Sequence, residues 1–463
     1  MRPPGYGEDQ PRLDDDRLPV VLVVLDGLGD RPVPELGGLT PSEAARTPVL
    51  DALAARGSSG WHLPFGWGRA PSSELAHWAM FGYDDVPFPG RAVLEALGAG
   101  LDVAPDTAVT HAALRTSTVA PDGRVWITGR TAGRDADDAA ALLDALGPVV
   151  AAHGARLERL GGRGEALLVL SSRGSGAVTD SDPFFEDRHP WLRVLACEEA
   201  ASSTAETLTA LLLEARSVLV EHPVNADRRA RDRPPLDVLT TKWSGARGDV
   251  PRFVDHVGVR GAAVTSTRLY RGLGALLDLR TRHLPPYLDP RADLGTELAD
   301  RLTAAQELLD EGAAFVHVHT KATDDAGHTK QPRAKLEVLE AADPGLGALH
   351  ELAHRAVVAV TGDHATPSTG GVLHTGDPTP LVVAGPTVRR DAVEAFGEGP
   401  AAAGWYGSLQ ARELLPLLLG HANRASFLGH RPTARPTAAL PDAPEAMVLP
   451  AGAWGRRGAR RSG

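Results

Sequence analysis

Four runs of apolar, mostly β-branched residues stand out along the chain. Ala- and Leu-rich stretches with helical periodicity alternate with them. Uninterrupted apolar runs of this length are typical of strands buried on both faces, as in a parallel sheet covered by helices. The pattern therefore predicts an α/β protein with a mostly parallel sheet and helices on both faces. The clearest predicted strands are residues 20–25, 314–318, 356–360 and 381–383.

The middle of the chain has a different pattern. It contains a hairpin-like segment at 119–125, two helical stretches and an apolar strand at 166–170. This predicts a smaller α+β domain over 114–244, inserted into a discontinuous domain of 18–113 and 245–430. Residues 1–17 and 431–463 show no sustained apolar periodicity, and we expect them to be disordered tails.

Composition excludes several classes of protein. The 463 residues carry 48 Lys and Arg against 59 Asp and Glu, a net charge of −11, which argues against nucleic acid as a partner. Cys197 is the only cysteine, so an intramolecular disulfide or a cysteine-based zinc site is impossible. No stretch resembles a signal peptide or a membrane span. We therefore expect a cytoplasmic protein without a membrane partner.

Ionisable residues follow three of the four predicted strands. An Asp after a strand is, at any one position, equally well explained as a turn or N-cap residue. Three strands that each deliver such residues to one sheet edge indicate a site instead, because ligands bind outside the carboxyl ends of parallel strands. The residues are Asp26 after the first strand, His319, Asp324 and His328 after the second, and Asp363 and His364 after the third.

These side chains suit a metal centre. Asp324 and His328 are spaced i,i+4 and share a face if helical, although such pairs are more often surface pairs. His374 follows in a Gly-rich stretch that can bend toward Asp363 and His364. Carboxylate and imidazole favour Zn²⁺ or Mn²⁺. Two such ions about 3.5–4 Å apart clamp a transferring phosphoryl group.

A candidate nucleophile lies in residues 70–77, where a Pro-containing turn enters a helix. Ser72 or Ser73 could simply cap that helix. The same position would also place a hydroxyl at a helix N-terminus, which favours phosphate. Nucleotide cofactors are not expected: the Gly27-Leu28-Gly29 segment has Pro32 at the third glycine position, and no Walker-type segment occurs.

In this order the motifs resemble the alkaline phosphatase superfamily and, more narrowly, the archaeal-type cofactor-independent (2,3-bisphosphoglycerate-independent) phosphoglycerate mutases. The resemblance covers about residues 18–425. Its most specific segments are 26–32, 40–48, 81–84, 319–328, 361–364 and 374–378.

The resemblance implies two divalent ions, Mn²⁺ or Zn²⁺ with Mg²⁺ and Co²⁺ as alternatives. It implies a phosphoserine intermediate and an inserted domain that acts as a substrate cap. Ser73 would be the catalytic nucleophile. One ion would be held by Asp26, Ser73, Asp363 and His364, and the other by Asp324, His328 and His374.

The chain departs from the family at its substrate side. Family Pro-Gly-Ser-Asp reads Pro71-Ser72-Ser73-Glu74, and an expected His-Arg pair reads Glu165-Ala166. We therefore expect phosphoglycerate mutase-like chemistry on a small phosphorylated acid, with a phosphatase or phosphodiesterase on the same scaffold as the alternative and a non-catalytic metal-binding relative as the weakest. Candidate substrate-binding residues are Arg91, Arg115, Arg130, Arg134, Arg228 and Lys321.

Overall fold

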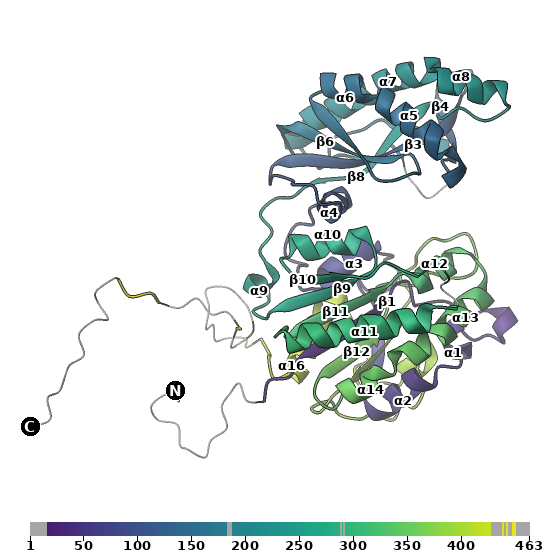
Figure 1. Ribbon diagram of the computed structural model, residues 1–463. Coiled ribbons are helices and arrows are strands. Elements are labelled where there is room, and N and C mark those ends of the chain that lie inside the picture. Colours follow the sequence, from purple (N-terminus) through teal and green to yellow (C-terminus); the bar gives the residue numbers. More distant parts are fainter. Residues whose placement is uncertain are drawn as a thin grey trace, which may run out of the picture.

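The computed structural model describes residues 16–182, 188–287, 289, 292–426, 438, 441–442 and 447–450. They form two lobes, each built on its own sheet (Figure 1). We call residues 107–246 the small lobe and the remaining described residues the large lobe. Most of both predicted tails lies outside the described residues, although Asp442 bonds to Arg424 of the large lobe.

The large lobe contains an eight-stranded sheet in the order β10-β9-β11-β1-β12-β13-β2-β14. Its strands are parallel except β13, which is antiparallel to both of its neighbours. The predicted mostly parallel sheet is therefore confirmed. The strands are β1 (Val20–Leu25), β2 (Ser58–His62), β9 (Gly261–Thr265), β10 (Arg280–His283), β11 (Phe315–Thr320), β12 (Val357–Thr361), β13 (Thr379–Ala384) and β14 (Ser408–Leu409).

Helices cover both faces of this sheet, as the fully apolar strands require. Val20, Leu22 and Val24 of β1 point to one core, with α3, α9, α10 and α16. Val21 and Val23 point to the other, with α2, α11, α13 and α14. The helices of the large lobe are α1 (Pro41–Ala44), α2 (Pro48–Arg56), α3 (Ser73–Met80), α4 (Arg91–Gly98), α9 (Phe253–His256), α10 (Arg268–Leu276), α11 (Leu294–Asp310), α12 (Ala322–His328), α13 (Pro332–Ala342), α14 (Ala348–Leu352), α15 (Glu398–Ala401) and α16 (Ala411–His421).

The small lobe is an antiparallel sheet packed against helices. Its strands run in the order β5-β6-β3-β4-β7, with β8 paired to β3. The predicted hairpin is present, with Val119 opposite Val125. The elements are β3 (Thr107–Val119), β4 (Val125–Arg130), α5 (Ala136–Ala145), α6 (Gly147–Ala152), β5 (Ala155–Arg159), β6 (Glu165–Arg173), β7 (His189–Pro190), α7 (Ser202–Glu221), α8 (Pro223–Ala230) and β8 (Val238–Ala246).

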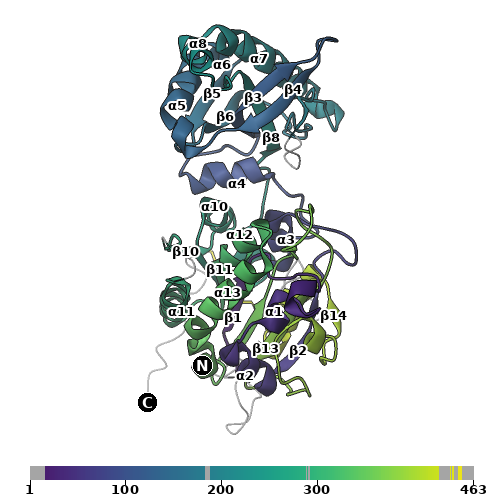
Figure 2. The same ribbon diagram turned by 90° about the vertical axis from the view of Figure 1, so that its right-hand side faces the viewer.

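Helix α4 lies between the lobes (Figure 2). It packs against α10 of the large lobe and against β3 and β8 of the small lobe. Gly90 precedes α4 at φ +95°, and a Cβ there would lie 2.7 Å from Gly245 Cα. Only glycine fits here, because the two segments of the chain approach each other so closely. No helix among the described residues is long and apolar enough to cross a membrane.

Candidate metal centre

The parallel register brings the predicted ligands to one edge of the large-lobe sheet. β1 pairs with β11 and β12, so that Leu25 lies opposite Thr320 and Val24 opposite Thr361. All three strands end at the same level. Asp26 follows β1 at once, and the segments after β11 and β12 carry the other candidate ligands.

The antiparallel strand β13 explains the position of His374. Thr379, the first residue of β13, lies opposite His62, the last residue of β2. The segment that precedes β13 therefore meets the same edge as the segment that follows β2. His374 on the first segment donates from Nδ1 to the carbonyl oxygen of Pro71 on the second, at 2.9 Å.

The candidate ligands form two neighbouring groups. In the Asp324 group, Asp324, His328 and His374 place their ligand atoms within 4.8 Å of one another. The Asp26 group, which contains Asp26, Asp363 and His364, does the same. The rings of His364 and His374 stack with centroids 3.8 Å apart, which joins the groups. The predicted i,i+4 helical pair is present in α12, with His328 Nε2 3.2 Å from Asp324 Oδ2.

Ser73 lies beside both groups. It is the first residue of α3 and is 5% exposed. Its Oγ is 2.9 Å from His364 Nε2 and 3.4 Å from Asp26 Oδ1. Ser72 is the N-cap residue, yet its side chain makes no capping hydrogen bond. Helix capping therefore does not account for either hydroxyl.

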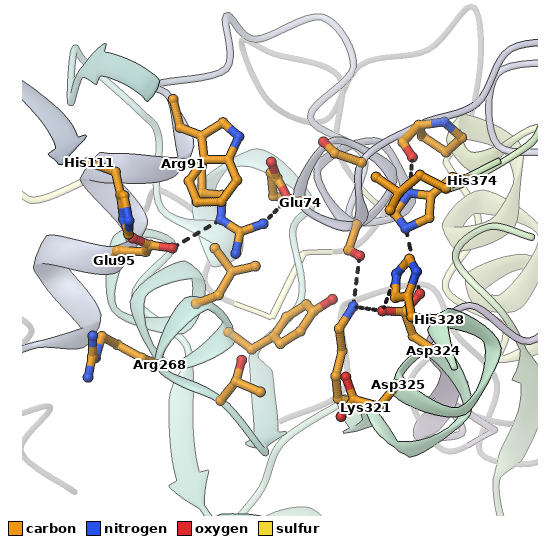
Figure 3. A pocket seen from close by; sticks show the side chains of 18 of the residues that line it. Glu74, Arg91, Glu95, His111, Arg268, Lys321, Asp324, Asp325, His328 and His374 are labelled. Atoms are coloured by element: carbon orange, nitrogen blue, oxygen red, sulfur yellow. Dashed lines mark hydrogen bonds and ion pairs between the residues drawn. The ribbon is translucent and has the colours of Figure 1, made fainter. Parts of the chain in front are cut away.

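Lys321 spans the two groups, and Figure 3 shows it beside Asp324 of one of them. Its Nζ is 2.8 Å from Asp26 Oδ1 and 2.7 Å from Asp324 Oδ2, and donates to Ser73 Oγ at 3.3 Å. Burial alone would lower the pKa of Lys321, but the two carboxylates raise it above its usual value. Lys321 is therefore a permanent cation beside the serine hydroxyl.

The electrostatics of the groups fit metal ions. Burial and the nearby Asp26 carboxylate raise the pKa of Asp363 well above its usual value, and Asp363 Oδ2 has no hydrogen-bond partner. His374 Nε2 is buried and also has none. Burial lowers the pKa of His364, which keeps its ring neutral, the form that binds metals. Divalent cations would supply both the missing partners and the missing charge.

Two of the three residues that support the ligands from behind, Tyr270 and Thr366, were not predicted from the sequence. Tyr270 Oη donates to Asp26 Oδ2 at 2.8 Å, and Thr366 Oγ1 donates to Asp324 Oδ1 at 2.6 Å. His319, which follows the second predicted strand, lies with Nε2 2.9 Å from Asp26 Oδ2. Tyr270 and Thr366 carry no sequence signal, because a Tyr in an amphipathic helix is indistinguishable from a core residue.

A cavity of about 960 Å³ extends from this centre toward the small lobe. Its metal end is lined by Ser73, Lys321, Asp324, His328 and His374. Its far end is lined by Arg91, Glu95, His111, Glu165, Trp243 and Arg268. Figure 3 shows the labelled residues of both ends.

Among the predicted substrate-binding residues, Arg91 and Lys321 line this cavity. Arg268, which the sequence did not single out, lines it too. Arg115 is buried and donates to Asp182 at 2.9 Å, and Arg228 donates to Asp135 at 2.9 Å. The cavity lining does not include Arg115, Arg130, Arg134 or Arg228.

Comparisons with known proteins agree with this geometry. The metalloenzyme superfamily matches residues 18–414. The 2,3-bisphosphoglycerate-independent phosphoglycerate mutase of Pyrococcus abyssi is 34% identical over 423 residues, 88% of this chain and 98% of that protein. The enzyme of the same name from Methanopyrus kandleri is 35% identical over 424 residues, 89% of this chain and 98% of that protein.

A solved structure has a similar fold. The cofactor-independent phosphoglycerate mutase of Thermoplasma acidophilum superposes with a TM-score of 0.59 at 30% identity, over 88% of this chain and all of that one. The chain therefore belongs to the metalloenzyme superfamily and, within it, to the family of 2,3-bisphosphoglycerate-independent phosphoglycerate mutases. It thus belongs to a family of isomerases.

Proposed function

We propose that this chain is a cytoplasmic phosphoglycerate mutase that moves a phosphoryl group between the 2- and 3-hydroxyls of glycerate through phosphoserine at Ser73. One observation carries the proposal. A buried serine hydroxyl at a helix N-terminus lies between two groups of metal-type ligands, beside a lysine that stays cationic.

The Asp26 group together with Ser73 would hold one divalent ion, and the Asp324 group would hold the other. When bound, such ions supply positive charge for the phosphoryl oxygens and lower the pKa of the serine hydroxyl. The family and the ligand groups support divalent metal binding. Two ions per chain, of Mn²⁺ or Zn²⁺, are our proposal.

The reaction needs two displacements at phosphorus. Ser73 Oγ loses its proton and bonds to phosphorus while the bond from phosphorus to the ester oxygen breaks, and that oxygen takes up a proton to give glycerate. The other hydroxyl of glycerate then loses its proton and bonds to phosphorus, and Ser73 regains its proton as the bond to Oγ breaks. Lys321, whose Nζ donates to Ser73 Oγ at 3.3 Å, would neutralise a phosphoryl oxygen during the transfer.

The small lobe would be the substrate cap, and the cations at the far end would hold the carboxylate. Arg91 donates to Glu95 at 3.0 Å and lies 3.4 Å from Glu74. Arg268 bonds to the carbonyl oxygen of Leu160 at 3.0 Å. Arg268 therefore has more donors left for a carboxylate than Arg91.

A phosphatase is the second candidate function. Glu74, Glu95 and Glu165 all line the cavity and oppose the retention of an acidic acceptor. If glycerate left before the second displacement, water would take the phosphoryl group.

The test feeds 3-phosphoglycerate to the metal-loaded protein and follows 2-phosphoglycerate and free phosphate together. We expect interconversion to exceed phosphate release. If free phosphate is the only product, the protein is a phosphatase and the proposed mutase activity is wrong. If neither product forms, the protein does not transfer the phosphoryl group of this substrate.

A further inference from the structure

His111 is a buried residue of the far end with one unused ring nitrogen. It lies on β3, is 3% exposed and lines the cavity. Its Nδ1 is 2.7 Å from Glu95 Oε2. Its Nε2 has no hydrogen-bond partner, and the nearest carboxylate oxygen, Glu165 Oε1, lies 3.9 Å away. A buried polar atom without a partner at a cavity wall is a candidate ligand contact.

The neighbours of His111 fix its orientation and its protonated nitrogen. Burial would raise the pKa of Glu95, but hydrogen bonds from His111 and Arg91 lower it to about 2. Glu95 is thus a carboxylate that can only accept, so His111 Nδ1 carries the hydrogen of their bond. Trp243 packs against the imidazole with ring centroids 5.1 Å apart. Nε2 is therefore the ring nitrogen that is left for a contact in the cavity.

We propose that His111 Nε2 is a substrate-binding atom that forms a hydrogen bond with a free hydroxyl of the phosphate ester. A hydroxyl can donate to this nitrogen or accept from it, and the carboxylates of Glu95 and Glu165 on either side disfavour the carboxylate of the ester at this point. The proposal rests on the proposed function and narrows its substrate class to phosphate monoesters of hydroxy acids.

The size of the cavity leaves two sources for that hydroxyl. A volume of about 960 Å³ is at the upper end of pockets that hold drug-sized ligands, so a three-carbon ester fills a small part of it. Such an ester would contact both ends if the lobes approach each other around it. An ester of a longer hydroxy acid would contact both ends without that movement.

The experiment measures binding by calorimetry in the Ser73→Ala protein, loaded with Mn²⁺, so that no turnover occurs. Two ligand pairs are compared: 3-phosphoglycerate with 3-phosphooxypropanoate, and 6-phosphogluconate with 6-phosphooxyhexanoate. The second member of each pair lacks the free hydroxyls. We expect the hydroxy ester of at least one pair to bind about ten- to hundredfold more tightly, as for other buried hydroxyl contacts. The pair that shows this preference identifies the length of the substrate.

His111→Phe in the same background should remove most of that preference, and His111→Gln should restore part of it through its amide group. His153→Phe is the matched control, because His153 is also a small-lobe histidine paired with a glutamate, at 2.8 Å from Glu214, and does not line the cavity. If His111→Phe is misfolded by circular dichroism, the glutamine variant decides.

A hydroxyl preference that survives both His111 variants would overturn the assignment of His111 and leave the mutase intact. If no ester binds and the unmodified protein turns over no phosphoglycerate, both the assignment of His111 and the proposed function are wrong.

Discussion

The metal end and the far end of the cavity hold their polar groups differently. At the metal end, carboxylates and imidazoles follow the ends of adjacent strands, and two buried atoms, Asp363 Oδ2 and His374 Nε2, have no hydrogen-bond partner. At the far end, most polar groups are paired with one another: Arg91 with Glu95 and Glu74, and His111 Nδ1 with Glu95, so that His111 Nε2 is the only buried atom among them without a hydrogen-bond partner. One end is prepared for an external cation, and the other is nearly balanced without a ligand.

The residues of the two ends are also held by different parts of the fold. The metal end belongs to a single sheet whose strands are buried on both faces. The far end combines residues of α4 and α10 in the large lobe with residues of β3, β6 and β8 in the small lobe. The candidate metal ligands thus lie at the rigid sheet of the large lobe, whereas the candidate substrate-binding residues lie where the two lobes meet.

The largest effect should come from Ser73→Ala. Loss of the nucleophile should lower kcat by at least about a thousandfold, measured as formation of 2-phosphoglycerate. Ser72→Ala is the matched control and should stay within about tenfold. Mass spectrometry of acid-quenched protein should find phosphate on Ser73, and phosphate on any other residue would contradict the mechanism.

The metal end should lose its ions one group at a time. His328→Ala should empty the Asp324 group and reduce the bound metal from two ions to about one, because only Asp324 and His374 remain. Asp363→Asn should act on the Asp26 group in the same way. Elemental analysis of folded protein checks both variants. If the folded wild-type protein holds no metal after loading with Mn²⁺, the metal end does not bind a cation and the contrast between the two ends is wrong.

Lys242 makes the small-lobe side of the far end sensitive to pH. It is 2% exposed, and burial together with Arg115 lowers its pKa to about 7. An unfolded lysine keeps its proton to about pH 10.4, so the unfolded chain binds more protons between these values and stability rises with pH there. Relative to Lys242→Met, the wild type should gain about 2 kcal/mol between pH 7 and pH 9.5. Urea unfolding of both proteins at the two pH values measures this, and parallel curves would reject it.

The smallest effect is expected at Arg268. Arg268→Gln should raise KM for 3-phosphoglycerate about tenfold, with a smaller change in kcat, if the guanidinium binds the carboxylate. Arg271→Gln on the same helix is the control, because Arg271 is exposed and does not line the cavity. If the KM values of the two variants are equal, Arg268 does not bind the carboxylate of the substrate.

The sequence predicted the metal end far better than the far end. The apolar run 20–25 is observed as β1 (Val20–Leu25), and Asp26 follows it as expected. Each ligand segment there is short and local, and parallel pairing alone brings the segments together. The position of His374 at this sheet edge depends on the antiparallel direction of β13, which no local sequence pattern indicated.

The far end depends on contacts that have no sequence signature. His111 and Trp243 meet because β3 pairs with β8, and α4 places Arg91 over Trp243 and Glu95 beside His111. The predicted start of the insertion, residue 114, falls inside β3, because a long strand shows no break in composition. Arg115 and Arg228 looked like substrate residues in sequence, yet their guanidinium groups bond to Asp182 and Asp135 inside the small lobe.

The pairing of β3 with β8 has a consequence for the evolution of this chain. Ala108 and Ala246, near the two points where the chain crosses between lobes, are direct partners in that ladder. The small lobe is therefore a cassette whose two ends meet, and replacing it leaves the spacing of the large-lobe chain unchanged. A lineage could exchange this cassette, and with it half of the substrate contacts, while the ligand-bearing sheet edge stayed intact.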